Sequence, residues 1–225
     1  MNKSVYFSSF VDDKKIATNP KTIHNNDEYR YSLTIFFKRK VAGPTAVVIM
    51  KNPSKAGIID ETNKKLLSDD TIYHVCDYIF KRQEKFSKLI ILNLFPIYGS
   101  TFKNIDFKNN IKQLTGKSGE YSRNDKEIET IVDSLTNTDK IILAWGGYPS
   151  LGVKKSSKNE EQKLEEQVKE QVKELYAQRI KKVLKIIDGR PTYKVGKGLT
   201  NGKFPQHGKM WYDYEELELF SHPTI

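Results

Sequence analysis

Four apolar runs along the chain each end in polar residues. The first three are made almost wholly of Val, Ile, Leu, Ala and Met, without the alternation that a half-exposed strand would show, and the fourth is Tyr193-Lys194-Val195-Gly196. The four runs cover residues 46–50, 89–92, 140–144 and 193–196. This pattern predicts strands that are buried on both faces of a sheet.

Helical patterns separate these runs. Asp69-Asp70-Thr71 can cap a helix whose apolar residues follow at helical spacing, and Asn124-Asp125 leads a second amphipathic segment. A third, Asn159–Ile187, is the longest, with Glu in its first half and Lys in its second, which suits the helix dipole. Buried strands joined by helical crossovers predict an α/β fold, a three-layer α/β/α sandwich around a mainly parallel sheet.

The domain organisation follows from length and local composition. The chain has 225 residues, 37% of them hydrophobic, which is enough for one sizeable core. Residues 1–28 are polar and irregular, so we expect an N-terminal arm packed on a single domain formed by residues 29–225. Within that domain, Tyr29–Phe37 is rich in aromatic and β-branched residues and is typical of an edge strand.

Composition restricts the chemistry. The single cysteine, Cys76, excludes an internal disulfide and a four-thiolate metal site, and His74 nearby has no further ligands beside it, so we expect no metal and no cofactor. No apolar stretch is long enough to span a bilayer and no secretory signal is evident, so we expect a cytoplasmic protein without a membrane partner.

The net charge favours a partner that carries phosphates. The formal charge is +10, and lysines that neutralise phosphates release condensed counterions on binding. Only six of the 38 basic residues are Arg, however, and the abundance of Lys, Asn and Ile can also reflect a compositional bias of the source.

Polar residues at the ends of the four runs mark the expected site. Asn52 follows the first run, Asn93 ends the second, Trp145-Gly146 follows the third, and His207 comes after the fourth. In open α/β sheets, ligands bind where the carboxyl ends of the strands converge. We therefore expect these residues to lie together.

The same residues resemble two known groups of proteins. One is an uncharacterised bacterial domain family that carries six short motifs in this order. The matching segments are Met50-Lys51-Asn52-Pro53-Ser54, Asp69-Asp70-Thr71, Asn93-Leu94-Phe95, Asn124-Asp125, Ala144-Trp145-Gly146 and Gly202-Lys203-Phe204-Pro205-Gln206-His207. More distantly, the order of the strand ends resembles the uracil-DNA glycosylase superfamily, which implies a glycosylase-like fold and an enzyme that flips a damaged or modified base of DNA and hydrolyses its N-glycosidic bond.

That resemblance implies catalytic roles for three residues. Asn52 would position the attacking water. Asp70 would act as a base, or else only cap the helix. His207 would donate a hydrogen bond to the departing base, which a neutral imidazole can do, or else lie in a surface turn.

It also implies residues that bind the nucleotide. Asn93 would recognise the edge of the base and Phe95 would stack on it, although Asn is also common in turns and Phe in cores. The other implied contacts are phosphate binding by Lys51, Ser54 and Lys55, which would otherwise be solvated loop positions, and a wedge in the base stack formed by Met210 or Trp211, which could equally cover the sheet edge.

The sequence departs from the glycosylase pattern at two positions. Met50-Lys51 stands where glycosylases have Gly before the catalytic pair, and Gly208 replaces a Pro after the late His. Two other function classes therefore stay open, a non-catalytic reader of nucleic acid or modified nucleotides and a hydrolase of small nucleosides or nucleotides. The sequence is equally compatible with repair, antiviral defence and base salvage, with DNA and RNA, and with more than one oligomeric state.

Overall fold

The structure is a computed structural model. It describes residues 4–20, 29–38, 40, 42–54, 56–60, 62–98, 119–149 and 159–221, and the side chains of residues 159–165 are excepted.

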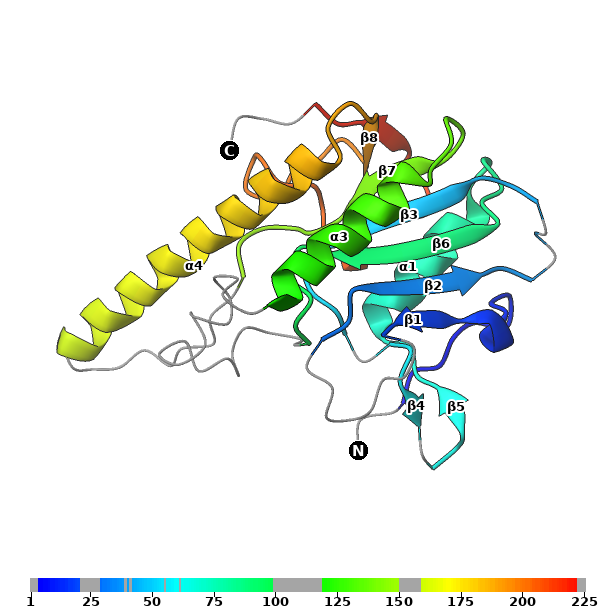
Figure 1. Cartoon of the computed structure of the whole chain (residues 1–225), viewed down its shortest axis with the longest axis horizontal. Helices are drawn as coiled ribbons and strands as arrows, with labels where there is room; N and C mark the ends of the chain where they lie inside the picture. Colours follow the sequence, from blue (N-terminus) through cyan, green and yellow to red (C-terminus); the bar gives the residue numbers. More distant parts are fainter. Residues whose placement is uncertain are drawn as a thin grey trace.

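A seven-stranded mixed sheet forms the centre of the molecule (Figure 1). Its strand order is β1-β2-β6-β3-β7-β8-β9. The four strands β6, β3, β7 and β8 are mutually parallel, whereas β1, β2 and β9 run antiparallel to their neighbours. The bounds are β1 Ala17–Asn19, β2 Ser32–Phe36, β3 Thr45–Met50, β6 Lys88–Asn93, β7 Lys140–Leu143, β8 Thr192–Val195 and β9 Leu217–Leu219.

Helices cover both faces of this sheet (Figure 1). On one face, α1 (Asp70–Lys81) packs through a core that includes Val48, Ile91 and Val75. On the other, α3 (Gly119–Asp133) and α4 (Asn159–Ile186) pack through a second core that includes Ile49 and Leu92. The two cores use alternate residues of the same strands, as the pleat requires. The sequence prediction of an α/β fold is confirmed.

Two expected elements differ from the structure. The segment expected as an edge strand is β2, which lies inside the sheet because residues 17–19 of the N-terminal segment pair with it as β1. The second crossover helix already includes Gly119, so Asn124 and Asp125 lie within α3 and do not start it. The long helix and the helix capped at Asp69 agree with expectation.

Smaller elements complete the fold. A two-stranded hairpin, β4 (Ile59–Asp60) and β5 (Lys65–Leu66), lies between β3 and α1 in the chain, and the short 3₁₀ helices η1 (Asp13–Lys15) and η3 (Gly208–Met210) lie near the two ends of the chain. Cys76 is a buried free thiol in the α1 core, as expected. Among the described helices, none combines the length and the apolar character needed to cross a membrane.

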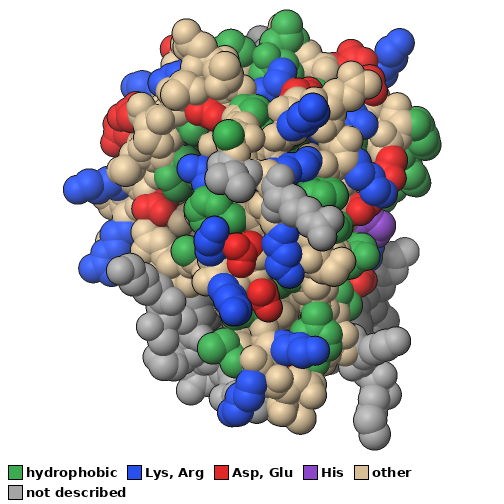
Figure 2. All heavy atoms as spheres, turned by 90° about the vertical axis from the view of Figure 1, so that its right-hand side faces the viewer, with side chains coloured by type: hydrophobic (Ala, Val, Ile, Leu, Met, Phe, Trp, Pro, Cys, Tyr) green, Lys and Arg blue, Asp and Glu red, His purple; other side chains and the backbone are tan. Residues whose placement is uncertain are grey.

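The amino ends of β3 and β6 form the face that Figure 2 shows, at the right of Figure 1. Basic and acidic side chains are interspersed on this face, without a large area of one sign. The positive net charge is therefore not gathered into a single patch on this side of the molecule.

Candidate functional site

The carboxyl ends of β3 and β6 hold two of the expected site residues close together. Met50 pairs with Asn93 in the parallel ladder. The pairing continues past the strands, because the Leu94 and Phe95 amides donate to the Met50 and Lys51 carbonyls at 2.8 and 2.9 Å. Asn52 is half-buried just beyond, and its Nδ2 donates to the Pro53 carbonyl at 3.3 Å.

The loop after Asn52 is anchored from two sides. The Arg30 guanidinium, wholly buried, donates to the carbonyls of Ser54 (3.2 Å) and Ala56. Burial lowers the pKa of Arg30, with Tyr98 and Asp69 acting in the opposite direction. On the other side the Ser54 hydroxyl donates to Oδ2 of Asp69. The position of Asn52 is thus fixed by a buried cation and a carboxylate.

Asp69, and not Asp70, is the carboxylate that contacts this loop. Its Oδ1 accepts from the amides of Thr71 and Ile72 at 2.8 and 3.0 Å, which caps α1. Asp70 is exposed in the first turn of the helix. The pattern of two adjacent aspartates did not distinguish them, because the choice depends on which residue adopts the extended backbone of a cap.

His207 joins the site from the C-terminal part of the chain. It precedes η3, and its Nδ1 accepts from the Lys209 amide at 3.3 Å, so a neutral ring carries its proton on Nε2. Burial, and then the positive charge of Lys51, lower the pKa of His207 to about 4, against a smaller opposite effect of Asp69. The imidazole is therefore neutral at pH 7, and Nε2–H donates to no other described residue.

Two glycines allow His207 to approach the sheet. A Cβ on Gly146 would lie 3.0 Å from the Cβ of His207, and one on Gly208 would lie 2.5 Å from Cγ2 of Val75 on α1. The second distance accounts for the glycine after the late histidine, since any side chain there would collide with the helix.

Lys51 lies at the same strand end and is mostly buried. Its Nζ is 5.4 Å from the centre of the Tyr176 ring on α4, and no described carboxylate pairs with it. Burial lowers the pKa of Lys51 to about 8. A fraction of this amine is therefore uncharged near neutral pH.

Tyr176 connects Lys51 to the turn beside His207. Its hydroxyl donates to the carbonyls of Trp145 and Gly146, at 3.1 and 2.9 Å. Trp145 itself is fully buried in the core. The sequence did not indicate this role for Tyr176, because an aromatic residue within an amphipathic helix is usually part of the core.

Asn93 is buried with an unpaired amide. It is 0% exposed, and neither Oδ1 nor Nδ2 has a hydrogen-bond partner among the described residues. Its backbone carbonyl accepts from Nδ2 of Asn124 at 3.1 Å. The Asn93 side chain can bind a ligand only if the residues around it move apart. Until then its unpaired polar atoms lower the stability of the fold.

The Asn124-Asp125 motif and Arg179 anchor the turn after β6. Arg179 on α4 donates from Nε to the Leu94 carbonyl at 2.9 Å and from Nη2 to Asp125 at 2.8 Å. Arg179 is 7% exposed and also lies over the Tyr121 ring. The Asn124-Asp125 motif, expected from the sequence to begin a helix, therefore orders the strand end through its contacts.

The remaining predicted residues differ in accessibility. Phe95 is 1% exposed, in the core between Tyr176 and Tyr121. Trp211 is buried against Tyr78, whereas Met210 is exposed. Lys55, expected from the resemblance to bind phosphate, lies outside the described residues.

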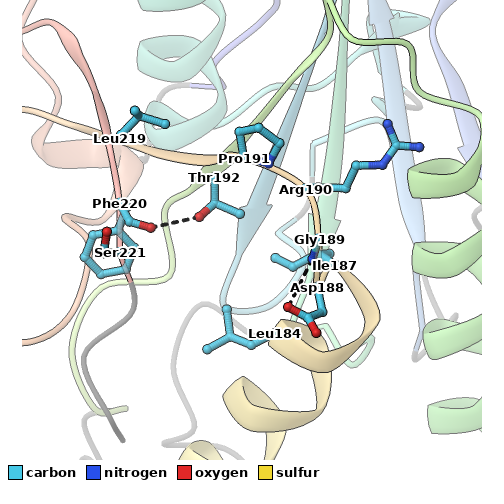
Figure 3. A pocket seen from close by; sticks show the side chains of 10 residues that line it. All are labelled: Leu184, Ile187, Asp188, Gly189, Arg190, Pro191, Thr192, Leu219, Phe220 and Ser221. Atoms are coloured by element: carbon cyan, nitrogen blue, oxygen red, sulfur yellow. Dashed lines mark hydrogen bonds between the residues drawn. The ribbon is translucent and has the colours of Figure 1, made fainter.

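A hollow elsewhere in the molecule contains none of the predicted site residues. It has a volume of about 280 Å³ and is formed where α4 leads into β8, beside Leu219 and Phe220 (Figure 3). The Thr192 hydroxyl donates to the Phe220 carbonyl at 3.0 Å across it. This region precedes β8, so it lies away from the carboxyl ends of the parallel strands.

No group of three or more His, Cys, Asp or Glu residues in the described part of the chain is placed to hold a metal ion. The polar side chains around Asn52 are instead an amide, an imidazole, an amine and a carboxylate. Such a set can orient water, donate hydrogen bonds and supply a nucleophilic amine.

Substituting Gly146 with alanine is expected to displace His207. Gly146 has φ +69°, which an L-residue adopts at a cost of about 1–2 kcal/mol, and the new Cβ would also press on His207. Gly189→Ala is a matched control, because its φ is +78° and nothing lies within 4 Å of the added Cβ. NMR of the His207 ring should shift in the first variant and not in the second. Equal shifts would contradict the contact.

The fold and these contacts define an α/β protein with a polar cluster at the carboxyl ends of its parallel strands. The model of the family described as "Protein of unknown function (DUF1643)" matches residues 30–194, so the chain belongs to this family. Searches of the curated proteins and of the solved structures found no match.

Proposed function

We propose that this protein is a DNA glycosylase-like enzyme, with a variant of the uracil-DNA glycosylase fold, that flips a damaged or modified base and hydrolyses its N-glycosidic bond. The feature that carries the proposal is the imidazole of His207, which lies close enough to Lys51 and Asp69 for both charges to act on it, and whose Nδ1 accepts from the Lys209 amide so that the neutral ring presents Nε2–H. Breaking this bond places negative charge on the departing base. An Nε2–H donor stabilises that charge without a prior proton transfer.

Asn52 supplies the second requirement, a positioned water. An amide cannot accept a full proton, so it acts by holding the water against the sugar carbon. The Arg30 and Asp69 contacts that anchor the loop make this position rigid. In this proposal Asp69 has the role of base that was expected of Asp70, because the Asp69 carboxylate is the one bonded to the loop. Its negative charge also favours the positive charge that develops on the sugar.

Asn93 is the residue proposed to recognise the base. A buried amide with a donor and an acceptor unpaired complements a base edge that offers the opposite pair. Binding would remove the cost of leaving these atoms unpaired. Bases that lack the matching groups would be rejected for the same reason.

The test uses oligonucleotides that carry uracil, hypoxanthine, hydroxymethylated or glucosylated bases, followed by alkali to cleave at abasic sites. We expect base release by the wild-type protein and a loss of about 10²–10³-fold in Asn52→Ala and in His207→Ala. His74→Ala is a matched control, because it removes an exposed imidazole on α1. Circular dichroism checks that each variant folds.

Each other outcome has a distinct meaning. Salt-dependent DNA binding without base release would indicate a non-catalytic reader. Release from free nucleosides alone would indicate a small-molecule hydrolase. Base release that is unchanged in Asn52→Ala and His207→Ala would refute the assigned roles.

A further inference from the structure

Lys51 has the environment of a reactive amine. It follows the last residue of β3, directly before Asn52, and it is mostly buried with no carboxylate partner among the described side chains. Surface lysines normally keep their ammonium group in water, so a lysine held against an aromatic ring at a strand end calls for another explanation. The Tyr176 ring and the Asn52 loop hold it at the site where the proposed reaction would take place.

The first product of the proposed reaction supplies a partner for such an amine. Removal of a base leaves an abasic deoxyribose, whose ring-opened form carries an aldehyde at C1′. That carbon is the one that Asn52 would present to water. Lys51 is the neighbouring residue, and its charge acts on the His207 ring, so we place its amine near the same position.

The geometry points to a second activity at this site, in which Lys51 forms an imine with the aldehyde of an abasic deoxyribose and cleaves the strand on its 3′ side by β-elimination. This inference rests on the proposed function for its natural substrate, but its chemistry can be tested with abasic DNA made beforehand. Imine formation by Lys51 differs from the phosphate contact that the sequence predicted for this residue, because a phosphate contact needs only a positive charge.

The steps balance with water as the only co-reactant. The Nζ lone pair adds to C1′, both hydrogens of the uncharged amine pass in turn to the aldehyde oxygen, and that oxygen leaves as water to give the imine. Water then removes a proton from C2′, a C2′=C3′ double bond forms, and the C3′–O bond breaks with its electron pair on the departing phosphate. Hydrolysis of the imine returns the free amine of Lys51 and an unsaturated aldehyde on the cleaved strand.

The lowered pKa of Lys51 favours the addition of its amine to the aldehyde. With a pKa of about 8, about a tenth of Lys51 is uncharged at pH 7, against roughly one in a few thousand for an ordinary lysine. Only the uncharged amine adds to an aldehyde. The reaction should therefore speed up between pH 7 and pH 8.5, by which point most of Lys51 is uncharged.

The experiment mixes the protein with an oligonucleotide that contains a preformed abasic site, in the presence of sodium borohydride, which reduces an imine to a stable crosslink. We expect a crosslinked band for the wild-type protein and a loss of at least about 100-fold in Lys51→Arg and Lys51→Met. Lys51→Arg keeps the charge for phosphate contact but cannot form the imine, so it should still bind intact DNA. Lys209→Arg, an exposed position near His207, is the control for crosslinking by surface lysines.

The outcomes separate this inference from the proposed function. No wild-type crosslink, or an equal crosslink in Lys51→Arg, overturns it, even when base release is observed. A crosslink that depends on Lys51 supports it, even when no base in the panel is released. Thermal unfolding of both variants shows whether the loss comes from the amine or from a disturbed fold.

Discussion

Replacing Arg179 with methionine is expected to lower the free energy of unfolding by about 3–5 kcal/mol. The guanidinium satisfies the Leu94 carbonyl and pairs with Asp125, and its own side chain is almost fully buried. Methionine fills a similar volume but leaves a carbonyl without a donor and a carboxylate without its cation. Urea unfolding of the two proteins measures the difference.

The controls for this prediction lie on the same two helices. Lys182→Met also removes a cation from α4, but the side chain is exposed, so a change within about 0.5 kcal/mol is expected. Combining Arg179→Met with Asp125→Leu should recover part of the loss, because no unpaired charge remains. A loss below about 1 kcal/mol in Arg179→Met would show that the pair does not hold the strand end.

Between pH 7 and pH 4.5 the wild-type protein is expected to lose about 2.5 kcal/mol more free energy of unfolding than the His207→Gln variant. The folded-state pKa of His207 is about 4, below the unfolded value of 6.5. Between these values the unfolded chain binds a proton that the folded chain does not bind. The part of the unfolding free energy that depends on a neutral His207 is therefore fully present above pH 6.5 and is lost as the pH falls toward 4.

Urea unfolding at pH 7 and at pH 4.5 measures this effect as the difference between the wild-type protein and His207→Gln. Other groups contribute equally to both proteins, so they cancel in that comparison. His74→Gln, which removes an exposed imidazole, should keep the wild-type pH dependence. If His207→Gln also kept it, the imidazole would not be held neutral by its surroundings.

The central strands and their crossovers could be predicted because their signals are local. All six residues of β3 are buried, and the apolar run that predicted this strand needs no long-range information. The capping segment Asp69-Asp70-Thr71 and the spacing of the apolar residues after it likewise predicted α1, although not which of the two aspartates is the cap. Long apolar runs and capped segments with helical spacing can therefore be assigned as strands and helices from the local sequence alone.

Pairing with distant segments could not be predicted. The three residues of β1, Ala-Thr-Asn, have no strand pattern, so nothing indicated that they would cover the edge of β2. The site shows the same limit, since motif order suggested that Asn52 and His207 meet but did not reveal Arg30 or Tyr176. Both act on the site through backbone carbonyls, which any sequence provides.

The topology also affects how the chain acquires its structure during synthesis. β3 leaves the ribosome before both of its neighbours, because the strands that pair with its two sides begin at Lys88 and Lys140. Until those segments emerge, the five apolar residues that follow Thr45 in β3 present two open hydrogen-bonding edges, the arrangement that promotes association between nascent chains. Pauses in translation between these points would prolong that exposure, and chaperones that shield extended apolar segments would shorten it.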